Sequence, residues 1–477
     1  MQIAFHHKKL FICWGFIFTA FFFLSLWYQI VLLAFIPFVL LTIPLVIAFP
    51  GLLFYALVIF LPLSVEYKFT DTLGSDLPDE FLMISTTGVF FLLMAYNPLL
   101  IRKNYLNHPL ILILLLHIGW IIITLIYSTN VVLSLKYLAA KTWYIIPFVL
   151  FLFLVVKNKK SFVAMSACLI LPMLFVVLQS LFRHLHFGFS FEKINNTLSP
   201  YFRNHVNYGA MLVCLLPVVL AWVRLADSRP IKFLAILIFL VFLTGVFFSY
   251  SRGAWLAIFV ALITAWMIRK RIMHWFFLGG VLAAIFGSLW LANDNRYLDY
   301  RPDFRKTIFH KDFREHMAAT YRGRDLSTAE RFYRWTAAKK MISARPLLGV
   351  GPNNFYDNYK PYATAAYKTW VSDNREHSTV HNYFLLLLTE QGIPGLLIFG
   401  GLLYGMFWYA QHIYNKQDSP FYKTITLAIA SILSMIVTVN FLSDLIETDK
   451  VGSLFFLCFG LLIVLDVERK GKVILRS

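Results

Sequence analysis

The stretch His381-Asn-Tyr-Phe-Leu-Leu-Leu-Leu-Thr-Glu390-Gln-Gly-Ile-Pro-Gly395 decides how this chain is organised. It opens on a polar pair, His381 and Asn382, and continues as an apolar helix pattern that carries one carboxylate, Glu390. It also follows the longest polar segment of the chain, so it begins where the chain re-enters a membrane. A histidine can take up or release a proton near neutral pH. The stretch is therefore either a membrane-entry helix with an incidental histidine or the edge of a functional site.

The composition of the chain indicates a membrane protein. Of its 477 residues, 59% are hydrophobic and 14% are charged, and the mean hydropathy is +0.70. A soluble protein of this size carries more charge. The net charge of +19 is explained by Lys and Arg in inner loops, which set the orientation of polytopic proteins. It gives no reason to expect nucleic-acid binding.

Recurring apolar runs, each long enough to cross hydrocarbon, predict an all-α, polytopic transmembrane helical bundle of about 12–14 spans with one large outer loop containing short helices. If the chain starts inside and alternates, short basic clusters fall inside and acidic segments such as Glu66–Glu80 fall outside, and both termini lie inside. The predicted spans are Leu10–Tyr28, Ile30–Ala48, Leu52–Ser64, Phe81–Leu99, Pro109–Tyr127, Trp143–Val156, Phe162–Phe182, Tyr208–Val223, Phe233–Phe248, Ala254–Ile268, Trp275–Leu291, Tyr383–Trp408, Thr424–Leu442 and Gly452–Leu465.

This pattern divides one membrane domain into three parts: a transmembrane bundle at residues 1–292, a loop region at residues 293–380 and C-terminal transmembrane helices at residues 381–477. In the loop region, Ser327-Thr-Ala-Glu330 has the spacing of a capping box and predicts the start of a helix. Pro346 predicts the end of that helix near Arg345, because the residue before a proline avoids helical backbone angles.

Polar groups gather at the outer ends of the predicted spans. Apart from His117 and Glu390, the apolar cores contain essentially no ionisable residue, which argues against an ion-coupled transporter. Guanidinium groups bind phosphate oxygens in two-point contacts, so the outer side predicts an anion site beside a proton acceptor. Its four clusters contain Arg203 and Asn207, Tyr250 and Arg252, Arg331 and Arg334, and His381 and Asn382.

Each of these residues also has a structural explanation. Arginines at span ends commonly reach lipid headgroups, and Glu390 could orient a neighbour or support a helix contact. Arg252 is the hardest to explain in this way, because its connection is too short for a generic loop and Gly253 permits close approach. His377 and His381 are four residues apart but lack the glutamate of a zinc-protease motif, so no metal site is expected.

Three motifs together resemble the O-antigen ligase and polymerase superfamily: Ser251-Arg252-Gly253, Pro346-Leu-Leu-Gly349-Val-Gly351-Pro-Asn-Asn-Phe355, and His381-Asn382-Tyr383 through Glu390-Gln-Gly392-Ile-Pro-Gly395. The resemblance is specific over Phe233–Gly400. It implies a metal-independent, cofactor-free glycosyltransferase of the bacterial inner membrane with cytoplasmic termini and an active site facing the periplasm. The family's general base falls on His381, and its diphosphate-binding arginines fall on Arg252 and, with weaker matches, on Arg203 and Arg331. Asn382, Glu390, Asn207 and Tyr250 are supporting candidates.

Ligases of this family move a finished glycan from undecaprenyl diphosphate to a lipid A core sugar or a similar acceptor. The implied partners are therefore the lipid-linked donor, the glycan acceptor and membrane lipids. A polysaccharide polymerase of the same superfamily would use the same donor and the same chemistry, and these residues do not separate the two. A flippase or exporter of lipid-linked oligosaccharides is a third alternative. It should line a central cavity with charge, whereas this sequence concentrates charge at the outer ends of its spans.

Overall fold

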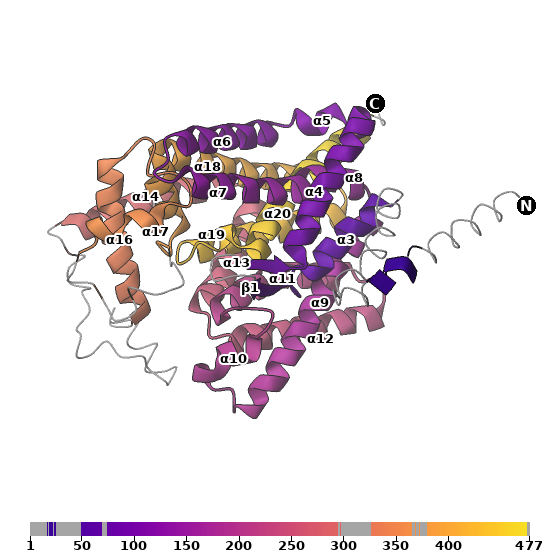
Figure 1. Cartoon of the computed structure of the whole chain (residues 1–477). Helices are drawn as coiled ribbons and strands as arrows, with labels where there is room; N and C mark the ends of the chain where they lie inside the picture. Colours follow the sequence, from indigo (N-terminus) through magenta and orange to yellow (C-terminus); the bar gives the residue numbers. More distant parts are fainter. Residues whose placement is uncertain are drawn as a thin grey trace, which may run out of the picture.

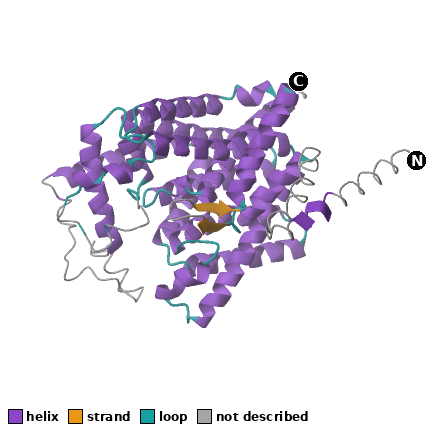
Figure 2. Cartoon of the chain, in the orientation of Figure 1, coloured by secondary structure: helices purple, strands orange, loops and turns teal. Residues whose placement is uncertain are grey.

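The computed structural model describes residues 49–68, 74–293, 326–364 and 379–474, together with isolated positions elsewhere. Most of these residues are helical. The sheet they contain is an antiparallel hairpin of two strands, β1 (Val65–Lys68) and β2 (Gly74–Leu77), which lies against the helices (Figure 2). The prediction of an all-α, polytopic bundle is confirmed.

Ten helices in the described part of the chain are long and apolar enough to span a membrane. Two shorter apolar helices, α3 and α14, accompany them. The twelve are α3 (Pro50–Phe60), α4 (Asp79–Tyr96), α6 (Pro109–Ile126), the continuous α7 (Val131–Ile145), η3 (Ile146–Phe151) and α8 (Leu152–Val155), α9 (Lys159–His186), α11 (His205–Leu225), α12 (Arg229–Phe248), α13 (Arg252–Lys270), α14 (Met273–Ala292), α18 (Tyr383–Lys416), α19 (Pro420–Asn440) and α20 (Asp449–Ile474) (Figure 1).

Every span predicted from Leu52 onward overlaps one of these helices, so the chain is a multi-pass membrane protein. The predicted spans Leu10–Tyr28 and Ile30–Ala48 fall almost wholly outside the described residues. Short segments complete the described helices: η2 (Pro98–Leu100), α5 (Lys103–Leu106), η4 (Phe191–Lys193), α10 (Ile194–Leu198), α16 (Leu326–Ala344), α17 (Phe355–Asn358), η6 (Lys360–Tyr362) and η8 (Leu445–Glu447).

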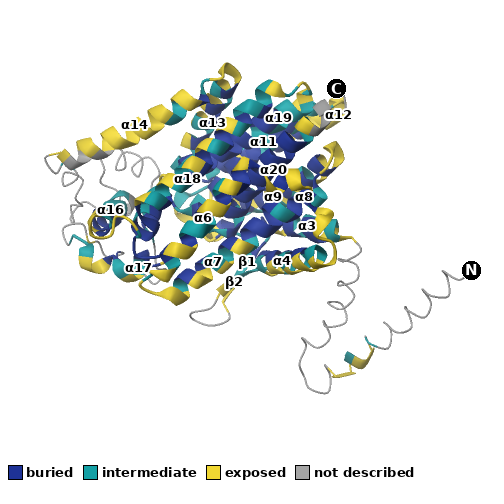
Figure 3. Cartoon of the chain, turned by 90° about the horizontal axis from the view of Figure 1, so that it is seen from above, coloured by how far each residue is buried: buried dark blue, intermediate teal, exposed yellow. Residues whose placement is uncertain are grey.

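Helix α20 lies at the centre of the bundle (Figure 3). In its apolar window 94% of the residues are buried, against 28% in α12 at the periphery. A helix that is apolar on every side is stable when other helices surround it. Close packing depends on Gly460, where an added Cβ would lie 2.6 Å from the backbone oxygen of Phe148. The central helix therefore has little room for larger side chains at that crossing.

Polar side chains from distant segments meet at two opposite ends of the bundle. At one end, Asp466 bonds to His108 at 3.3 Å and to Arg469 at 2.8 Å. At the other end, Arg203 of the α10–α11 connection pairs with Glu66 of the hairpin at 2.6 Å. The first group comes from segments predicted inside and the second from segments predicted outside. We call these the inner and outer ends.

One predicted span boundary is corrected. Helix α7 begins at Val131, well before the predicted start at Trp143. The reason is local capping, because the side chain of Asn130 accepts a hydrogen bond from the backbone nitrogen of Leu133 at 3.4 Å. The polar residues of the first turns, among them Lys141, conceal the helix when only hydropathy is read.

The predicted capping box is also corrected. Helix α16 already contains Ser327, so Ser327 is not the residue before the helix. The Glu330 carboxylate, which a capping box would direct back to the cap, instead accepts hydrogen bonds from Arg334 at 2.8 Å and from Ser372 at 2.6 Å. The predicted end of this helix near Arg345 agrees with its last residue, Ala344.

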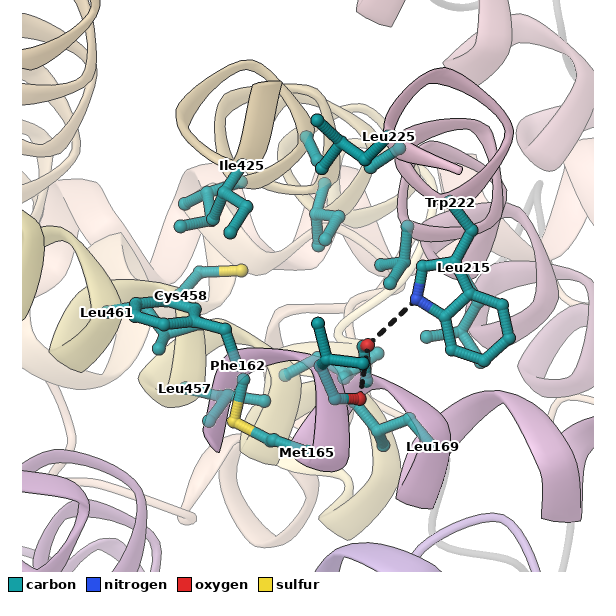
Figure 4. Close-up of a pocket in the computed structure, with 18 of the residues that line it drawn as sticks. Phe162, Met165, Leu169, Leu215, Trp222, Leu225, Ile425, Leu457, Cys458 and Leu461 are labelled. Atoms are coloured by element: carbon teal, nitrogen blue, oxygen red, sulfur yellow. Dashed lines mark hydrogen bonds between the residues drawn. The ribbon is translucent and has the colours of Figure 1, made fainter. Parts of the chain in front are cut away.

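An apolar pocket of about 90 Å³ lies between α9, α11, α19 and α20 (Figure 4). It is lined by hydrocarbon side chains such as Leu215 and Leu457. Its drawn polar contacts are two hydrogen bonds: the indole nitrogen of Trp222 donates to the Ser166 hydroxyl at 2.9 Å, and that hydroxyl donates to the Val163 backbone oxygen at 2.8 Å. With so little polar lining, the pocket offers no group for chemistry on a sugar or a phosphate.

Candidate functional site

The start of α18 is fixed by a cap and by a backbone contact. The side-chain oxygen of Asn382 accepts from the backbone nitrogen of Leu385 at 3.0 Å, so Asn382 is the N-cap. His381 has a φ of 53°, which is uncommon for a residue other than glycine. The backbone nitrogen of Tyr383 donates to the Ser443 oxygen at 3.0 Å. Ser443 belongs to residues 441–444 after α19, which we call the outer turn.

Helix α16 lies against the same outer turn. The Nη2 atom of Arg331 donates to the backbone oxygen of Leu442 at 3.2 Å. One turn further along, the indole nitrogen of Trp335 donates to the backbone oxygen of Val380 at 3.1 Å, directly before His381. Arg331 and His381, which belong to two separate sequence clusters, are therefore brought to one place by the outer turn.

The Ser-Arg-Gly corner that starts α13 meets this turn from the other side. An added Cβ on Gly253 would lie 3.7 Å from the Leu442 side chain, and Gly253 directly follows Arg252. The corner also packs tightly on α11, since a Cβ on Gly209 would lie 2.7 Å from the Cβ of Ser251. The segments that contain Arg252, Arg331 and His381 thus meet at residues 441–444.

The surroundings of His381 keep its imidazole neutral. Burial, together with the positive charges of Arg334 and Arg331, lowers the pKa of His381 from 6.5 to about 3. Arg334 is 1% exposed and is held by Glu330 at 2.8 Å. Its Nε and Nη2 atoms have no hydrogen-bond partner among the described residues. The site therefore combines a neutral histidine with fixed positive charge.

A partly buried carboxyl group, that of Asp444, lies at the end of the outer turn. Burial raises the pKa of Asp444, while a hydrogen bond donated by the Thr379 hydroxyl lowers it in part. The same hydroxyl oxygen accepts from the backbone nitrogen of His381 at 3.4 Å. Thr379 therefore links Asp444 to the backbone of the candidate base.

Glu390 is a structural anchor in this arrangement. Its Oε1 atom accepts from the backbone nitrogen of Phe355 at 3.0 Å, and its Oε2 atom accepts from that of Asn353 at 2.9 Å. Two otherwise unpaired N–H groups of the Gly349–Phe355 turn are satisfied in this way. Glu390 thus holds the Gly349–Phe355 turn against α18. This is the structural explanation given for Glu390 from the sequence, the support of a helix contact.

Two glycines make this contact possible. Helix α18 is interrupted at Gly392, which has a φ of 69°, and a Cβ there would lie 2.1 Å from the Leu347 backbone oxygen. Gly349, with a φ of 65°, would place a Cβ 2.6 Å from the Glu390 backbone oxygen. Both positions therefore require glycine. The second and third motifs of the sequence are one packed unit.

Arg203, Asn207 and Tyr250 lie apart from this unit. Arg203 pairs with Glu66, and both Arg203 and Asn207 line a cavity at the outer end. The Tyr250 hydroxyl donates to the Phe189 backbone oxygen at 2.5 Å, and burial raises the pKa of this phenol. None of these contacts involves His381.

Sequence reading missed a buried ion pair near the site. Lys141 of α7 is 3% exposed and its Nζ lies 2.8 Å from the Glu447 carboxylate. The Tyr137 hydroxyl donates to the same carboxylate at 3.1 Å. Tyr137, Lys141 and Tyr144 recur at helical spacing, and that polar stripe was the available signal. Within the described residues, no group of three or more His, Cys, Asp or Glu side chains is arranged to hold a metal ion.

Comparisons with known proteins bear on the region that contains this site. Residues 236–400 match the sequence model of a family described as O-antigen ligase. Over these residues the chain is similar to the O-antigen ligase family. The matched region contains Arg252, Arg331 and His381, and the superfamily resemblance seen in the motifs is confirmed.

A curated relative supports the same superfamily. The chain is 26% identical over 214 residues to the O-antigen ligase of Salmonella typhimurium, an alignment that covers 43% of this chain and 47% of that protein. The chain thus matches about half of the length of this relative. The matched region, residues 236–400, is accordingly the part of the chain on which its function can be argued.

Proposed function

We propose that this protein is a glycosyltransferase of the O-antigen ligase type, which transfers a glycan from undecaprenyl diphosphate to a lipid A core sugar or a similar acceptor. The observation that carries the proposal is that the segments containing Arg252, Arg331 and His381, all within the matched region, meet at the outer turn. The family match supplies the reaction class, and the convergence supplies the groups that the reaction needs.

In this proposal His381 is the general base. Its neutral imidazole takes the proton of the acceptor hydroxyl as that oxygen attacks the anomeric carbon of the donor sugar. The bond between the anomeric carbon and the phosphate oxygen breaks, and undecaprenyl diphosphate leaves with the electron pair. The proton then passes from the imidazolium to the solvent. A direct displacement of this kind inverts the anomeric configuration.

The arginines act on the leaving group. Charge grows on the diphosphate as the glycosidic bond breaks, and fixed guanidinium groups stabilise that charge. We assign this role to Arg252 and Arg331, which lie at the outer turn, with Arg334 adding fixed positive charge beside His381. We leave Arg203 out of this group, because its partner is Glu66. The donor sugar is already linked to a good leaving group, the diphosphate, so the reaction needs no nucleotide.

The setting of the site fits a lipid-linked donor. The outer turn lies where three long apolar helices begin or end, so a polyprenyl chain can stay in the bilayer while its diphosphate reaches the arginines. We propose that this end faces the periplasm, with the protein in the inner membrane and both termini in the cytoplasm. Residues 293–380 would then form the periplasmic loop between the bundle at residues 1–292 and the helices at residues 381–477.

A deletion strain analysed for its surface glycolipids tests the function. We expect full-length glycan to remain on the lipid carrier while the acceptor stays bare. Single repeat units attached to the acceptor would contradict the ligase proposal and indicate a polymerase instead.

Point variants test the residue roles in membranes with confirmed expression. His381→Ala should lower the transfer rate by about 10²–10⁴-fold, the usual contribution of a general base. His186→Ala, which removes an exposed histidine from the last turn of α9, is the matched control and should leave it unchanged. Arg252→Lys keeps the charge but loses the two-point contact. Normal turnover in either His381→Ala or Arg252→Lys would remove that residue from the mechanism.

A further inference from the structure

A second concave site lies at the outer end of the bundle. It is a cavity of about 420 Å³ between the β1–β2 hairpin, α7, the start of α11 and the start of α20. This volume is within the roughly 300–1,000 Å³ of small-molecule sites in proteins. We call it the outer cavity. The proposed transfer chemistry at residues 441–444 does not use it.

The lining of the outer cavity is rich in carboxyl groups. Five acidic residues, Glu66, Asp76, Glu80, Glu447 and Asp449, line it, against two cationic residues, Arg203 and Lys450. The two cations are already engaged. Arg203 pairs with Glu66 at 2.6 Å, and Lys450 donates to the backbone oxygens of Ser64 at 2.9 Å and Tyr201 at 2.7 Å. Glu66 is paired with Arg203 and Glu447 with Lys141, which leaves Asp76, Glu80 and Asp449 in excess over Lys450. This balance disfavours a diphosphate and favours a neutral or positively charged ligand.

Aromatic rings share the lining with the carboxylates. Trp143 and Tyr201 are partly exposed at the cavity wall, and the Phe202 ring lies 4.5 Å from Lys450 Nζ. Carboxylates accept hydrogen bonds from hydroxyl groups, and ring faces cover the apolar C–H faces of a sugar. Carboxylates together with aromatic rings form the kind of surface that a carbohydrate fits.

One polar atom beside this wall lacks a partner among the described residues. The indole nitrogen of Trp143, a residue that lines the cavity, is a buried donor without an acceptor. Buried polar atoms in native proteins are normally paired. Because this nitrogen is not exposed to the open cavity, the Trp143 ring must turn for a ligand hydroxyl group to supply the missing acceptor.

The outer cavity is joined to the site around His381. Glu447, which lines the cavity, binds Lys141 and Tyr137 and lies in η8, directly after the outer turn. One short segment, Phe441–Lys450, therefore passes from the arginines and the histidine to the cavity wall. A substrate with a phosphate at the outer turn could extend its sugar along this segment.

We propose that the outer cavity binds a sugar residue, neutral or amino-substituted, of one of the two substrates. The inference rests on the proposed glycan transfer and adds to it a separate subsite for the carbohydrate. The sugar belongs either to the donor glycan or to the acceptor, because both offer the same hydroxyl chemistry.

Binding can be tested without turnover. Full-length protein in lipid nanodiscs is titrated with the methyl glycosides of glucose, galactose and glucosamine and with glucose 6-phosphate, using saturation-transfer NMR. At least one of the three methyl glycosides should bind saturably, and glucose 6-phosphate should bind at least about tenfold more weakly, equivalent to about 1.4 kcal/mol. Trp143→Ala and Asp76→Asn should each weaken binding at least fivefold. Asp357→Asn, an exposed carboxylate outside the cavity, is the matched control and should not.

Clear results would overturn the proposal. Absence of saturable binding by all three glycosides, or equal binding in folded cavity variants and wild type, would do so. Saturable Ca²⁺ or Mg²⁺ binding that Asp76→Asn abolishes, without sugar binding, would assign the cavity to a cation.

Transfer kinetics separate the two sources of the sugar. A rise in KM for the acceptor alone in Trp143→Ala places the acceptor sugar in the cavity, and a rise in KM for the donor alone places the donor sugar there. Unchanged values for both contradict the subsite. If sugar binding persists while the wild-type protein transfers no glycan, the proposed function fails and the cavity remains. If transfer persists while no sugar binds, the cavity assignment fails and the function remains.

Discussion

His381 is well suited to be neutral but poorly suited to be a strong base on its own. Burial and the charges of Arg334 and Arg331 lower its pKa to about 3, so the ring is unprotonated at neutral pH but holds a proton weakly. A bound diphosphate would reverse part of this effect, since negative charge nearby favours the imidazolium. The donor would then strengthen the base that activates the acceptor. In this way the enzyme would avoid activating the acceptor before the donor is in place.

This electrostatic argument predicts a change in pH dependence. Arg331→Gln removes one positive charge from beside His381, so the protonated ring becomes easier to form and its pKa should rise from about 3 toward 6.5. Because activity needs the neutral ring, activity should be lost at a higher pH as the medium is acidified. The acid limb of kcat/KM, which reports the free enzyme, measures this shift. Arg102→Gln, at the exposed inner end, should leave the limb in place. If the pKa of the acid limb stays the same or falls in Arg331→Gln, the charge of Arg331 does not lower the pKa of His381.

Lys141 and Glu447 offer a second prediction at the scale of single residues. Lys141→Met leaves the partly buried Glu447 without its cation, and breaking such a pair should cost up to about 3 kcal/mol of stability. Lys141→Met combined with Glu447→Gln removes both charges and should recover most of that loss. Thermal unfolding of the purified variants in the same detergent measures the difference. A double variant no more stable than Lys141→Met would show that charge pairing is not what matters.

At the scale of elements, the decisive feature is the interruption of α18. At 1.5 Å per residue a helix of 34 residues would be about 50 Å long, more than the roughly 30 Å of hydrocarbon it must cross. Gly392 divides it, and the backbone nitrogen of Ile393 donates to the Pro346 oxygen at 2.8 Å. The loop after α16 thus supplies a hydrogen-bond acceptor at the interruption of α18. The position of α16, and with it Arg331, depends on this joint.

The joint predicts opposite effects for two glycines of the same helix. Gly392→Ala forces a side chain into a positive φ and against the Leu347 carbonyl, which should cost on the order of 3 kcal/mol and lower transfer activity. Gly400→Ala meets no atom within 4 Å, and alanine favours a helix by about 1 kcal/mol over glycine, so it should be neutral or stabilising. Thermal unfolding and transfer assays of the two variants make the comparison. Equal behaviour of both would show that the joint does not position the site.

Elements were more predictable from the sequence than contacts. The run of apolar residues after Asn382 and the proline after Arg345 locate helix ends, because these signals are local. The partners of Glu390 and Arg203 could not be read, since Phe355 and Glu66 lie far away in the chain and only the packed bundle brings them close. The start of α7 was missed for another reason. Its polar first turns face other protein segments at the outer end, so hydropathy underestimates the helix.

At the scale of the whole molecule, charge segregation was predictable because it follows a rule of membrane insertion rather than a particular contact. Asp466 gathers His108, Arg469 and Lys470 at one end, while Glu66 and Arg203 meet at the other. The packed structure thus groups the segments that the orientation rule places together. It leaves open only which end faces which compartment, and the proposed chemistry requires the outer end to face the periplasm.

Sidedness can be measured by cysteine labelling of intact cells. In a background without native cysteines, Lys193→Cys and Asp357→Cys place thiols at exposed outer-end positions, and Asp227→Cys and Asp418→Cys place them at exposed inner-end positions. A reagent that cannot cross the inner membrane should label the first pair directly and the second pair only after permeabilisation. The opposite pattern would put His381 in the cytoplasm, where undecaprenyl-linked glycan that has already been flipped cannot reach it. A mixed pattern within one pair would contradict the grouping of segments itself. Because all four positions are exposed in the described structure, access to the compartment, and not burial, decides the result.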